Sequence, residues 1–295
     1  MDRTCLIVGC GYVGRRLARR MQAGWHVAGA VRSAATAREL SAAGVEAIAF
    51  DLDSEPVTDA LRRLVDRSVL AWLAPPPDTG TTDLRLERFF AELGDARPTA
   101  LLYMSTTGVY GDAAGGTVTE DSPARPANDR SRRRLAAERR SVTWCARSGV
   151  RCVILRVPAI YGPHRLPLER LRRGEPALRP EESGPGNRIH VDDLVSACAA
   201  ALEQPVHGVF NVGDGDHSST TVFLQRTAAL AGLQQPRLVS MDAARRLLTP
   251  GMLSFLVESR RVDAHRMRET LLPVLAYPTL DAGIAASLAE MAVTS

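Results

Sequence analysis

Three glycines near the start of the chain have a spacing that can bind a phosphate. Gly9, Gly11 and Gly14 form the pattern G-x-G-x-x-G between a short apolar run and a segment with helical periodicity. In such a loop the first glycine permits a tight turn, the second admits a pyrophosphate, and the third lets the helix lie close to the strand. The helix N-terminus adds unpaired N–H groups that favour negative charge. The loop, with Tyr12 and Val13 before its last glycine, is therefore a candidate dinucleotide-binding site.

The composition excludes several other kinds of chemistry. All 37 basic residues among the 295 are arginine, so Schiff-base formation, a P-loop lysine and a lysine-assisted tyrosine acid are excluded. Five cysteines occur without a C-x-x-C pair or a Cys/His cluster. We therefore expect reduced thiols, no disulfide framework and no metal site. The cysteines are Cys5, Cys10, Cys145, Cys152 and Cys198.

Hydropathy and charge set expectations about partners. No apolar run reaches the length of about 18 residues that spans a bilayer, and the N-terminus is typical of a strand rather than a signal peptide. We expect a cytoplasmic protein with no membrane partner. The basic stretch 130–140 is interrupted by Glu138 and lacks interleaved aromatic residues, which favours a solvated helix face over a nucleic-acid surface. A small-molecule substrate and a monomer or homodimer are expected.

Strand-like and helix-like segments alternate through the first two hundred residues. Strands are expected at 5–8, 26–31, 45–50, 68–73, 100–104, 152–157 and 209–212, and helices at 12–23, 34–43, 57–65, 84–93, 132–148 and 189–202. The alternation predicts an α/β fold of the Rossmann type, a doubly wound parallel sheet with helices on both faces. Ligands bind such sheets beyond the carboxyl ends of the strands. We expect a Rossmann domain at 1–165, completed by 186–212, and a smaller C-terminal substrate-side cap formed by 166–185 and 213–295.

Six segments, in order, resemble the extended short-chain dehydrogenase/reductase superfamily, and within it the NAD(P)-dependent epimerase/dehydratase group. They are 9–14, 105–111, 134–138, 155–163, 188–193 and 210–213. The segment 277–283 further resembles atypical members described as nucleotide-sugar epimerases. The resemblance implies an NAD(P)-binding protein that acts on a nucleotide sugar or a related carbonyl compound.

The resemblance also places cofactor contacts at the strand ends. Arg32 stands where an NAD-preferring site has an acidic residue, and a guanidinium suits a 2′-phosphate, to which Ser33 can add a hydroxyl. We therefore expect NADP, with NAD as the alternative; a surface arginine without a ligand is the other interpretation of Arg32. The remaining contacts implied are Asp51 at the adenine edge, Ala74 and Pro75 under the ribose, and Pro158 and Ala159 beside the nicotinamide. Asp51 is otherwise a turn or helix-capping residue.

The catalytic pattern departs from the family. Thr106 occupies the family's Ser/Thr position, but the Tyr-x-x-x-Lys motif is absent: Arg134 stands at the lysine position and Arg130 at the tyrosine position. Arg134 can still bind ribose hydroxyls, whereas Arg130 cannot deliver and retrieve a proton at neutral pH. Thr106 and Arg134 are the candidate catalytic residues, together with Tyr110 as a candidate acid.

Three hypotheses account for the missing tyrosine. Another cleft residue supplies the proton, with Tyr110, Tyr161 and His164 as candidates; the reaction requires no tyrosine; or the protein is a catalytically silent NADP-binding regulator or redox sensor. The two tyrosines belong to family motifs and are expected to pack around the cofactor. His190 is expected to be structural, with Asp192 or Asp193 capping the helix that follows.

Overall fold

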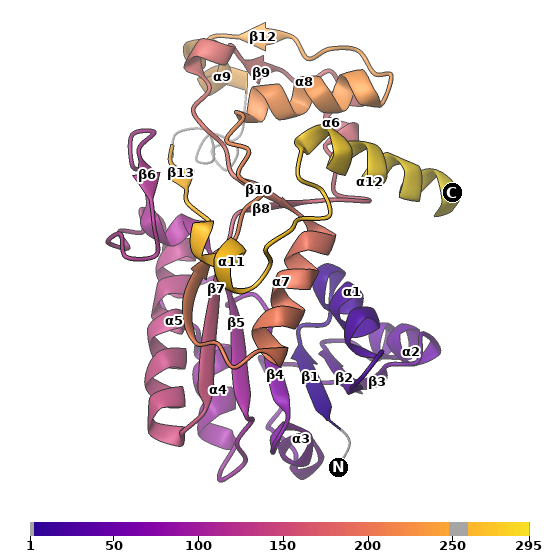
Figure 1. The fold of residues 1–295 in the computed structure, drawn as a ribbon, viewed down its shortest axis with the longest axis vertical. Helices are drawn as coiled ribbons and strands as arrows, with labels where there is room; N and C mark the ends of the chain where they lie inside the picture. Colours follow the sequence, from indigo (N-terminus) through magenta and orange to yellow (C-terminus); the bar gives the residue numbers. More distant parts are fainter. Residues whose placement is uncertain (1–2, 248–258, 295) are drawn as a thin grey trace.

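The computed structural model describes residues 3–247 and 259–294. Seven parallel strands form the main sheet in the order β11-β7-β5-β4-β1-β2-β3 (Figure 1). The strand order reverses beside β1, which creates the switch point where such sheets bind ligands. The doubly wound parallel sheet predicted from the sequence is confirmed. Its strands are β1 (Thr4–Val8), β2 (His26–Val31), β3 (Glu46–Ala49), β4 (Val69–Trp72), β5 (Ala100–Thr106), β7 (Arg151–Val157) and β11 (Gly208–Asn211).

Helices cover both faces of this sheet. In β1, Cys5 and Ile7 pack into one core, while Leu6 and Val8 pack into the other, as the alternation of side chains along a strand requires. Because both faces of the sheet are buried, the strands appear in the sequence as continuous apolar runs. One face carries α1 (Tyr12–Met21), α2 (Ala34–Ala42) and α7 (Val191–Glu203), and the other carries α3 (Asp59–Val65), α4 (Leu84–Glu92) and α5 (Asp129–Ser148).

Side-chain caps determine where the helices begin. Ser33, Thr58, Asp83 and Asn128 each accept a hydrogen bond from a backbone N–H three residues further on. The Asn128 cap starts α5 at Asp129, earlier than the apolar periodicity indicates.

The predicted helix 189–202 needs a correction at its start. Ile189 lies in the short strand β10 (Arg188–His190), which pairs with β8 (Ala159–Tyr161). His190 then caps α7, because its Nδ1 accepts a hydrogen bond from the Asp192 N–H. The helix therefore begins at Val191, and neither Asp192 nor Asp193 is its cap.

A smaller part lies beyond the carboxyl ends of the main strands, at the top of Figure 1. Its strands β9 and β12 pair in parallel, and α8 packs against both α6 and α12. Its elements are α6 (Leu168–Arg172), β9 (Ala177–Leu178), a 3-10 turn η2 (Pro180–Glu182), α8 (Thr220–Leu230), β12 (Leu238–Val239), α9 (Met241–Leu247) and α12 (Leu280–Thr294).

One late segment returns to the Rossmann part. β13 (Arg261–Val262) pairs with β6 (Thr117–Val118), and α11 (His265–Thr270) contributes Met267 to the core beneath α1 and α7. The sequence analysis assigns all of 213–295 to the cap, and β13 and α11 are therefore exceptions to that expected division.

Candidate functional site

The glycine loop between β1 and α1 leaves room for a ligand on one side only. Gly9 has φ +86°, and a Cβ there would lie 2.4 Å from the backbone nitrogen of Ala74. A Cβ on Gly14 would lie 3.1 Å from the Gly9 carbonyl oxygen and 3.2 Å from Ile7. At Gly11 a Cβ would meet only the Gly9 carbonyl oxygen, at 4.0 Å. Two glycines thus permit close packing of the loop, and the third faces open space.

The first turn of α1 fits a phosphate group chemically. Gly11 is the N-cap and offers no side-chain hydrogen bond to the first N–H groups, and the first turn contains no acidic residue. These N–H groups can therefore donate to an anion. Tyr12 donates a hydrogen bond to the Pro163 carbonyl oxygen at 2.8 Å, while the Val13 side chain is buried in the core. Any contact of Val13 with a ligand would be made by its backbone.

Arg32 and Ser33 lie at the end of β2. The Arg32 side chain is 69% exposed, and its ion pair with Asp53 is long, at 3.9 Å. Asp53 is held mainly by Arg85, which donates to both carboxylate oxygens at 2.6 and 2.5 Å and lowers the Asp53 pKa. Ser33 caps α2 by accepting from the Thr36 N–H at 3.2 Å. Arg32 is thus accessible to an added anion.

The structure supports the turn interpretation of Asp51. Its carboxylate accepts hydrogen bonds from the Asp53 N–H at 3.0 Å and the Ser54 hydroxyl at 3.1 Å, so it stabilises its own loop. Ala74 continues the backbone ladder by donating to the Val8 carbonyl oxygen at 3.0 Å. The adjacent Pro75 offers its carbonyl oxygen to Arg85, 3.0 Å away. An adenine contact of Asp51 stays a prediction.

Thr106 and Arg134 come together at the carboxyl end of β5. The Thr106 hydroxyl oxygen accepts from the Gly108 N–H at 3.1 Å, which leaves its O–H as a potential donor toward a ligand. Arg134 donates from Nη1 to the Met104 carbonyl oxygen at 2.6 Å, and its guanidinium lies 5.8 Å from the centre of the Tyr103 ring. Both side chains line the same cavity.

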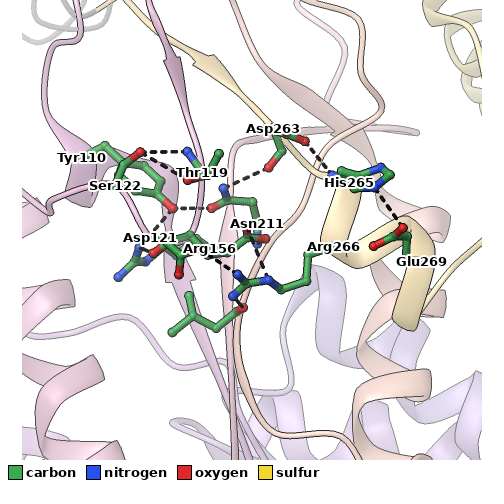
Figure 2. A network of polar contacts seen from close by, with 12 residues as sticks. Tyr110, Thr119, Asp121, Ser122, Arg156, Asn211, Asp263, His265, Arg266 and Glu269 are labelled. Atoms are coloured by element: carbon green, nitrogen blue, oxygen red, sulfur yellow. Dashed lines mark hydrogen bonds and ion pairs between the residues drawn. The ribbon is translucent and has the colours of Figure 1, made fainter.

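Tyr110 does not line this cavity, and its role as an acid stays a prediction. It lies in the 3-10 turn η1 (Thr107–Tyr110), is 3% exposed, and donates to the Asn211 side-chain oxygen at 2.6 Å. Arg156 donates to the Tyr110 hydroxyl at 3.0 Å, within the polar network shown in Figure 2. Burial raises the pKa of Tyr110. The hydroxyl therefore joins β7 and β11 to η1, and its proton is engaged away from the cleft.

The other two candidate proton donors lie elsewhere as well. Tyr161 is 2% exposed, and its ring packs edge-on against His190 and Phe223. His164 is an exposed loop residue with φ +61°. Neither residue lines the cavity that contains Thr106.

The cavity lies between the Rossmann part and the smaller part and has a volume of about 540 Å³. Thr106, Pro158 and Ala159 line it at the ends of β5 and β7, and residues 183–188 and Phe223 line it from the other side. Its lining, within residues 3–247 and 259–294, includes no His, Cys, Tyr, Asp or Glu side chain. The described walls therefore carry no group that readily exchanges a proton near neutral pH.

Five arginines line this cavity: Arg130, Arg134, Arg170, Arg188 and Arg260. Arg188 donates to the Ser218 carbonyl oxygen at 2.6 Å, and Arg170 to that of Pro176 at 2.8 Å. Arg134 and Arg260 likewise donate to backbone carbonyl oxygens. Carbonyl oxygens are neutral, so these bonds position the guanidinium groups without neutralising them; Glu175 forms an ion pair with Arg170 at 3.7 Å. The arginine-rich lining suits an anionic ligand.

Sequence reasoning did not assign Arg170, Arg188 or Arg260 to the site. Arg188 opens one of the six segments that resemble the family, but its side-chain direction depends on the β8–β10 pairing, which periodicity does not reveal. Arg170 lies in a proline-rich segment that was expected to form part of the cap. Arg260 reaches the cavity because the chain returns from the smaller part toward β6.

His190 and Asp193 hold the C-terminal segment against α7. The His190 ring is 1% exposed, with Nε2 3.2 Å from the Ser287 hydroxyl of α12, and it stacks on Tyr277 at 4.0 Å. The Asp193 carboxylate accepts from the N–H groups of Ala276 and Tyr277 at 2.7 and 3.2 Å. The structural role expected for His190 therefore agrees with its contacts.

This contact predicts a specific pH dependence of stability. Burial lowers the pKa of His190 to about 4, from an ordinary value of 6.5. The unfolded chain therefore binds more protons between these values, so the contribution of His190 is present above pH 6.5 and is lost as pH falls toward 4. We expect His190→Asn, which keeps the capping acceptor, to remove about 2–3 kcal/mol of this acid sensitivity.

Urea unfolding from pH 4.5 to 7.5 measures the effect. His207→Gln, a change at an exposed histidine, is the control and should leave the acid sensitivity attributed to His190 in place. If the free energy of unfolding changes equally with pH in wild type and in His190→Asn, His190 does not titrate as described.

The described residues were also searched for metal sites and for membrane-spanning helices. In residues 3–247 and 259–294, no group of three or more His, Cys, Asp or Glu side chains could hold a metal ion. In the same ranges, no helix combines the length and hydropathy needed to cross a membrane.

Comparison with solved structures finds the same fold over almost the whole chain. A conserved protein of unknown function from Silicibacter pomeroyi DSS is 31% identical, covers 98% of this chain and 99% of its own, and has a TM-score of 0.84. MoeE5 in complex with UDP-glucose and NAD is 23% identical, with 99% coverage of both chains and a TM-score of 0.78. UDP-glucuronic acid 4-epimerase from Bacillus cereus in complex with NAD is 18% identical, with coverages of 98% and 99% and a TM-score of 0.77.

Sequence comparisons agree with the structural ones. The uncharacterized protein y4nG of Sinorhizobium fredii is 29% identical over 130 residues, which are 42% of this chain and 33% of that protein. The chain thus matches about a third of the length of this relative. A model of the NAD dependent epimerase/dehydratase family matches residues 5–213. The chain belongs to the NAD dependent epimerase/dehydratase family.

Proposed function

We propose that this protein binds NADP(H) at the glycine loop and a nucleotide sugar in the adjoining cavity, and that it acts there as an epimerase, dehydratase or reductase. The cavity carries the proposal: five arginines are among its described lining residues, which include no Asp or Glu, and four of the five donate to backbone carbonyl oxygens. The diphosphate of a nucleotide sugar matches this charge. The solved structures with UDP-glucose and with UDP-glucuronic acid, each bound together with NAD, support the same substrate class.

Each part of the site has a separate role in this proposal. The N–H groups of the Gly9–Gly14 loop would hold the cofactor pyrophosphate, and Arg134 would orient the adjacent ribose. Bound nicotinamide supplies a centre that accepts or donates hydride. Thr106 would donate its O–H to the oxygen on the reacting carbon, because its hydroxyl is oriented by the hydrogen bond that it accepts from the Gly108 N–H and its O–H is still able to donate.

The preference for NADP over NAD depends on Arg32. Its exposed guanidinium can make charge-assisted hydrogen bonds to a 2′-phosphate. We expect Arg32→Ala to weaken NADP binding about 10- to 100-fold and to leave NAD binding unchanged. Tryptophan fluorescence titration of both cofactors measures these affinities.

Arg38→Ala is the matched control, because Arg38 is an exposed arginine on the neighbouring helix α2. It removes the same net charge and should change neither affinity. If wild type binds NAD and NADP equally, or if both variants behave alike, Arg32 does not select the phosphate.

A catalytically silent regulator is the second candidate function. The observation that favours it is the described cavity lining, which contains no side chain that readily exchanges a proton near neutral pH. Incubation with UDP-glucose or UDP-glucuronic acid in the presence of NADP⁺ or NADPH separates the two functions. Absorbance change at the nicotinamide band, or an epimer detected by NMR, supports the enzyme. Tight binding of both ligands without either change supports the regulator.

A further inference from the structure

A carboxylate lies beside the arginine on which the NADP preference depends. Asp53 lies in the loop after β3, and its Oδ2 is 3.9 Å from Nη2 of Arg32. The two side chains are 47% and 69% exposed. An uncompensated carboxylate at this place would repel a 2′-phosphate and would compete with it for the Arg32 guanidinium. An NADP site here therefore needs a further group that compensates the charge of Asp53.

Arg85, in the first turn of α4, provides this compensation. Its Nε and Nη2 donate to the two carboxylate oxygens of Asp53 at 2.6 and 2.5 Å, which is the bidentate arrangement that a guanidinium favours. The Arg85 side chain is 11% exposed, so this pair is screened less than the longer contact with Arg32. The hydrogen bonds from Arg85 lower the pKa of Asp53, which keeps the carboxylate ionised and paired.

Backbone contacts hold the Arg85–Asp53 pair in place. Nη1 of Arg85 donates to the Pro75 carbonyl oxygen at 3.0 Å, which ties α4 to the loop after β4. Arg88, one turn further along α4, donates to the carbonyl oxygens of Leu52 and Asp53 at 2.5 and 3.0 Å. The loop that carries Asp53 is therefore fastened mainly to α4.

We propose that Arg85 is a positioning residue for the cofactor, which compensates the Asp53 carboxylate and thereby keeps Arg32 available for the 2′-phosphate of NADP(H). This inference rests on the proposed function, because it takes Arg32 to be the group that recognises this phosphate.

Loss of Arg85 would change the partners of Asp53. The exposed Arg32 side chain can then turn to the carboxylate and form the close ion pair that Arg85 otherwise forms. A carboxylate without Arg85 can also accept a hydrogen bond from the 2′-hydroxyl of NAD. Both changes shift the cofactor preference from NADP toward NAD.

Calorimetric titration of NADP⁺ and NAD⁺ tests the proposal in wild type, Arg85→Gln and the double variant Arg85→Gln/Asp53→Asn. We expect Arg85→Gln to lower the ratio of NADP affinity to NAD affinity about 5- to 20-fold. The added Asp53→Asn removes the competing charge and should return the ratio to within about 2-fold of wild type. An equal loss of both affinities in Arg85→Gln, or a ratio that stays low in the double variant, would overturn the proposal.

Arg88→Gln is the matched control. It removes the same charge from the same helix, but Arg88 donates to backbone carbonyl oxygens and not to the Asp53 carboxylate. The variant should keep the ratio of the two affinities within about 2-fold of wild type, even where a looser loop weakens both cofactors. A fall in the ratio equal to that of Arg85→Gln would mean that positive charge alone, and not the pairing with Asp53, sets the preference.

A measurement without cofactor separates this inference from the proposed function. NMR gives the pKa of the Asp53 carboxyl group in wild type and in Arg85→Gln, each with and without Arg32→Ala. We expect Arg32→Ala to raise this pKa more in the Arg85→Gln protein, because Arg32 pairs closely with Asp53 only where Arg85 is absent. Equal shifts in the two proteins would overturn the inference. If the shifts differ as expected but Arg32→Ala leaves NADP binding unchanged, the inferred pairing holds and the proposed recognition of the 2′-phosphate fails.

Discussion

Replacing Gly9 with alanine is expected to abolish tight cofactor binding and to destabilise the protein. The added Cβ would lie 2.4 Å from the Ala74 nitrogen and 2.6 Å from its Cα, so the glycine loop or the segment that follows β4 must move. The positive φ adds backbone strain, and together these effects cost about 2–5 kcal/mol. A displaced loop also misaligns the N–H groups for pyrophosphate, which lowers affinity about 100-fold or more. Urea unfolding and NADP titration measure the two losses.

Gly24→Ala is the matched control, because a Cβ there meets no atom within 4 Å. It should leave both stability and affinity close to wild type. Normal NADP affinity in Gly9→Ala would mean that the loop does not hold the cofactor, whatever the effect on stability.

Loss of Glu138 is expected to have the second large effect. Its carboxylate pairs with Arg156 at 2.8 Å and accepts a hydrogen bond from Ser105, and both members of the ion pair are at least nine-tenths buried. Glu138→Ala would leave the Arg156 guanidinium buried without its counter-charge, at a cost of about 3–5 kcal/mol. The free energy of unfolding in urea measures this cost.

An exposed ion pair provides the comparison. Arg15 and Glu39 lie 2.6 Å apart but are 44% and 62% exposed, so Glu39→Ala should cost less than about 1 kcal/mol. Similar costs for the two variants would contradict the view that burial makes the Glu138 pair important. Since Arg156 also donates to Tyr110, the same loss should loosen the network of Figure 2.

Local patterns in the sequence predict most of the Rossmann part. Apolar runs bounded by glycine and polar residues mark the strands, because each strand of a parallel sheet is buried on both faces. The glycine spacing marks the loop, since the steric limit at Gly14 comes from Gly9 and Ile7, which are close to it in the sequence, although the limit at Gly9 comes from the more distant Ala74. These features depend on neighbours along the chain or on the repeating geometry of the sheet, and both are visible in the sequence.

Features that depend on distant contacts are less predictable. Tyr110 looks like an acid of the cleft until its partner Asn211 is known, and that partner lies 101 residues away. Asp51 carries a carboxylate at the expected place, but local hydrogen bonds engage both of its oxygens. Arg188 reaches the cavity through the β8–β10 pairing, which a periodicity of two or 3.6 residues does not encode.

The cavity shows where the two arginines that stand in place of the Tyr-x-x-x-Lys motif lie. Arg130 and Arg134 both line the cavity that contains Thr106. The resemblance to the family places them where a proton-transfer pair is expected, and a guanidinium keeps its positive charge at neutral pH. We therefore expect this change to affect both the ligands that the cavity favours and the reactions that it supports.

A crystal structure of the protein with NADP⁺ and UDP tests the central claim most directly, namely that the glycine loop and the arginine cavity hold two different diphosphates. We predict the dinucleotide pyrophosphate at the N–H groups that follow Gly9, and the UDP diphosphate within hydrogen-bond distance of Arg188 or Arg170. A UDP molecule bound outside the cavity, or a dinucleotide whose pyrophosphate does not contact the glycine loop, would contradict the account.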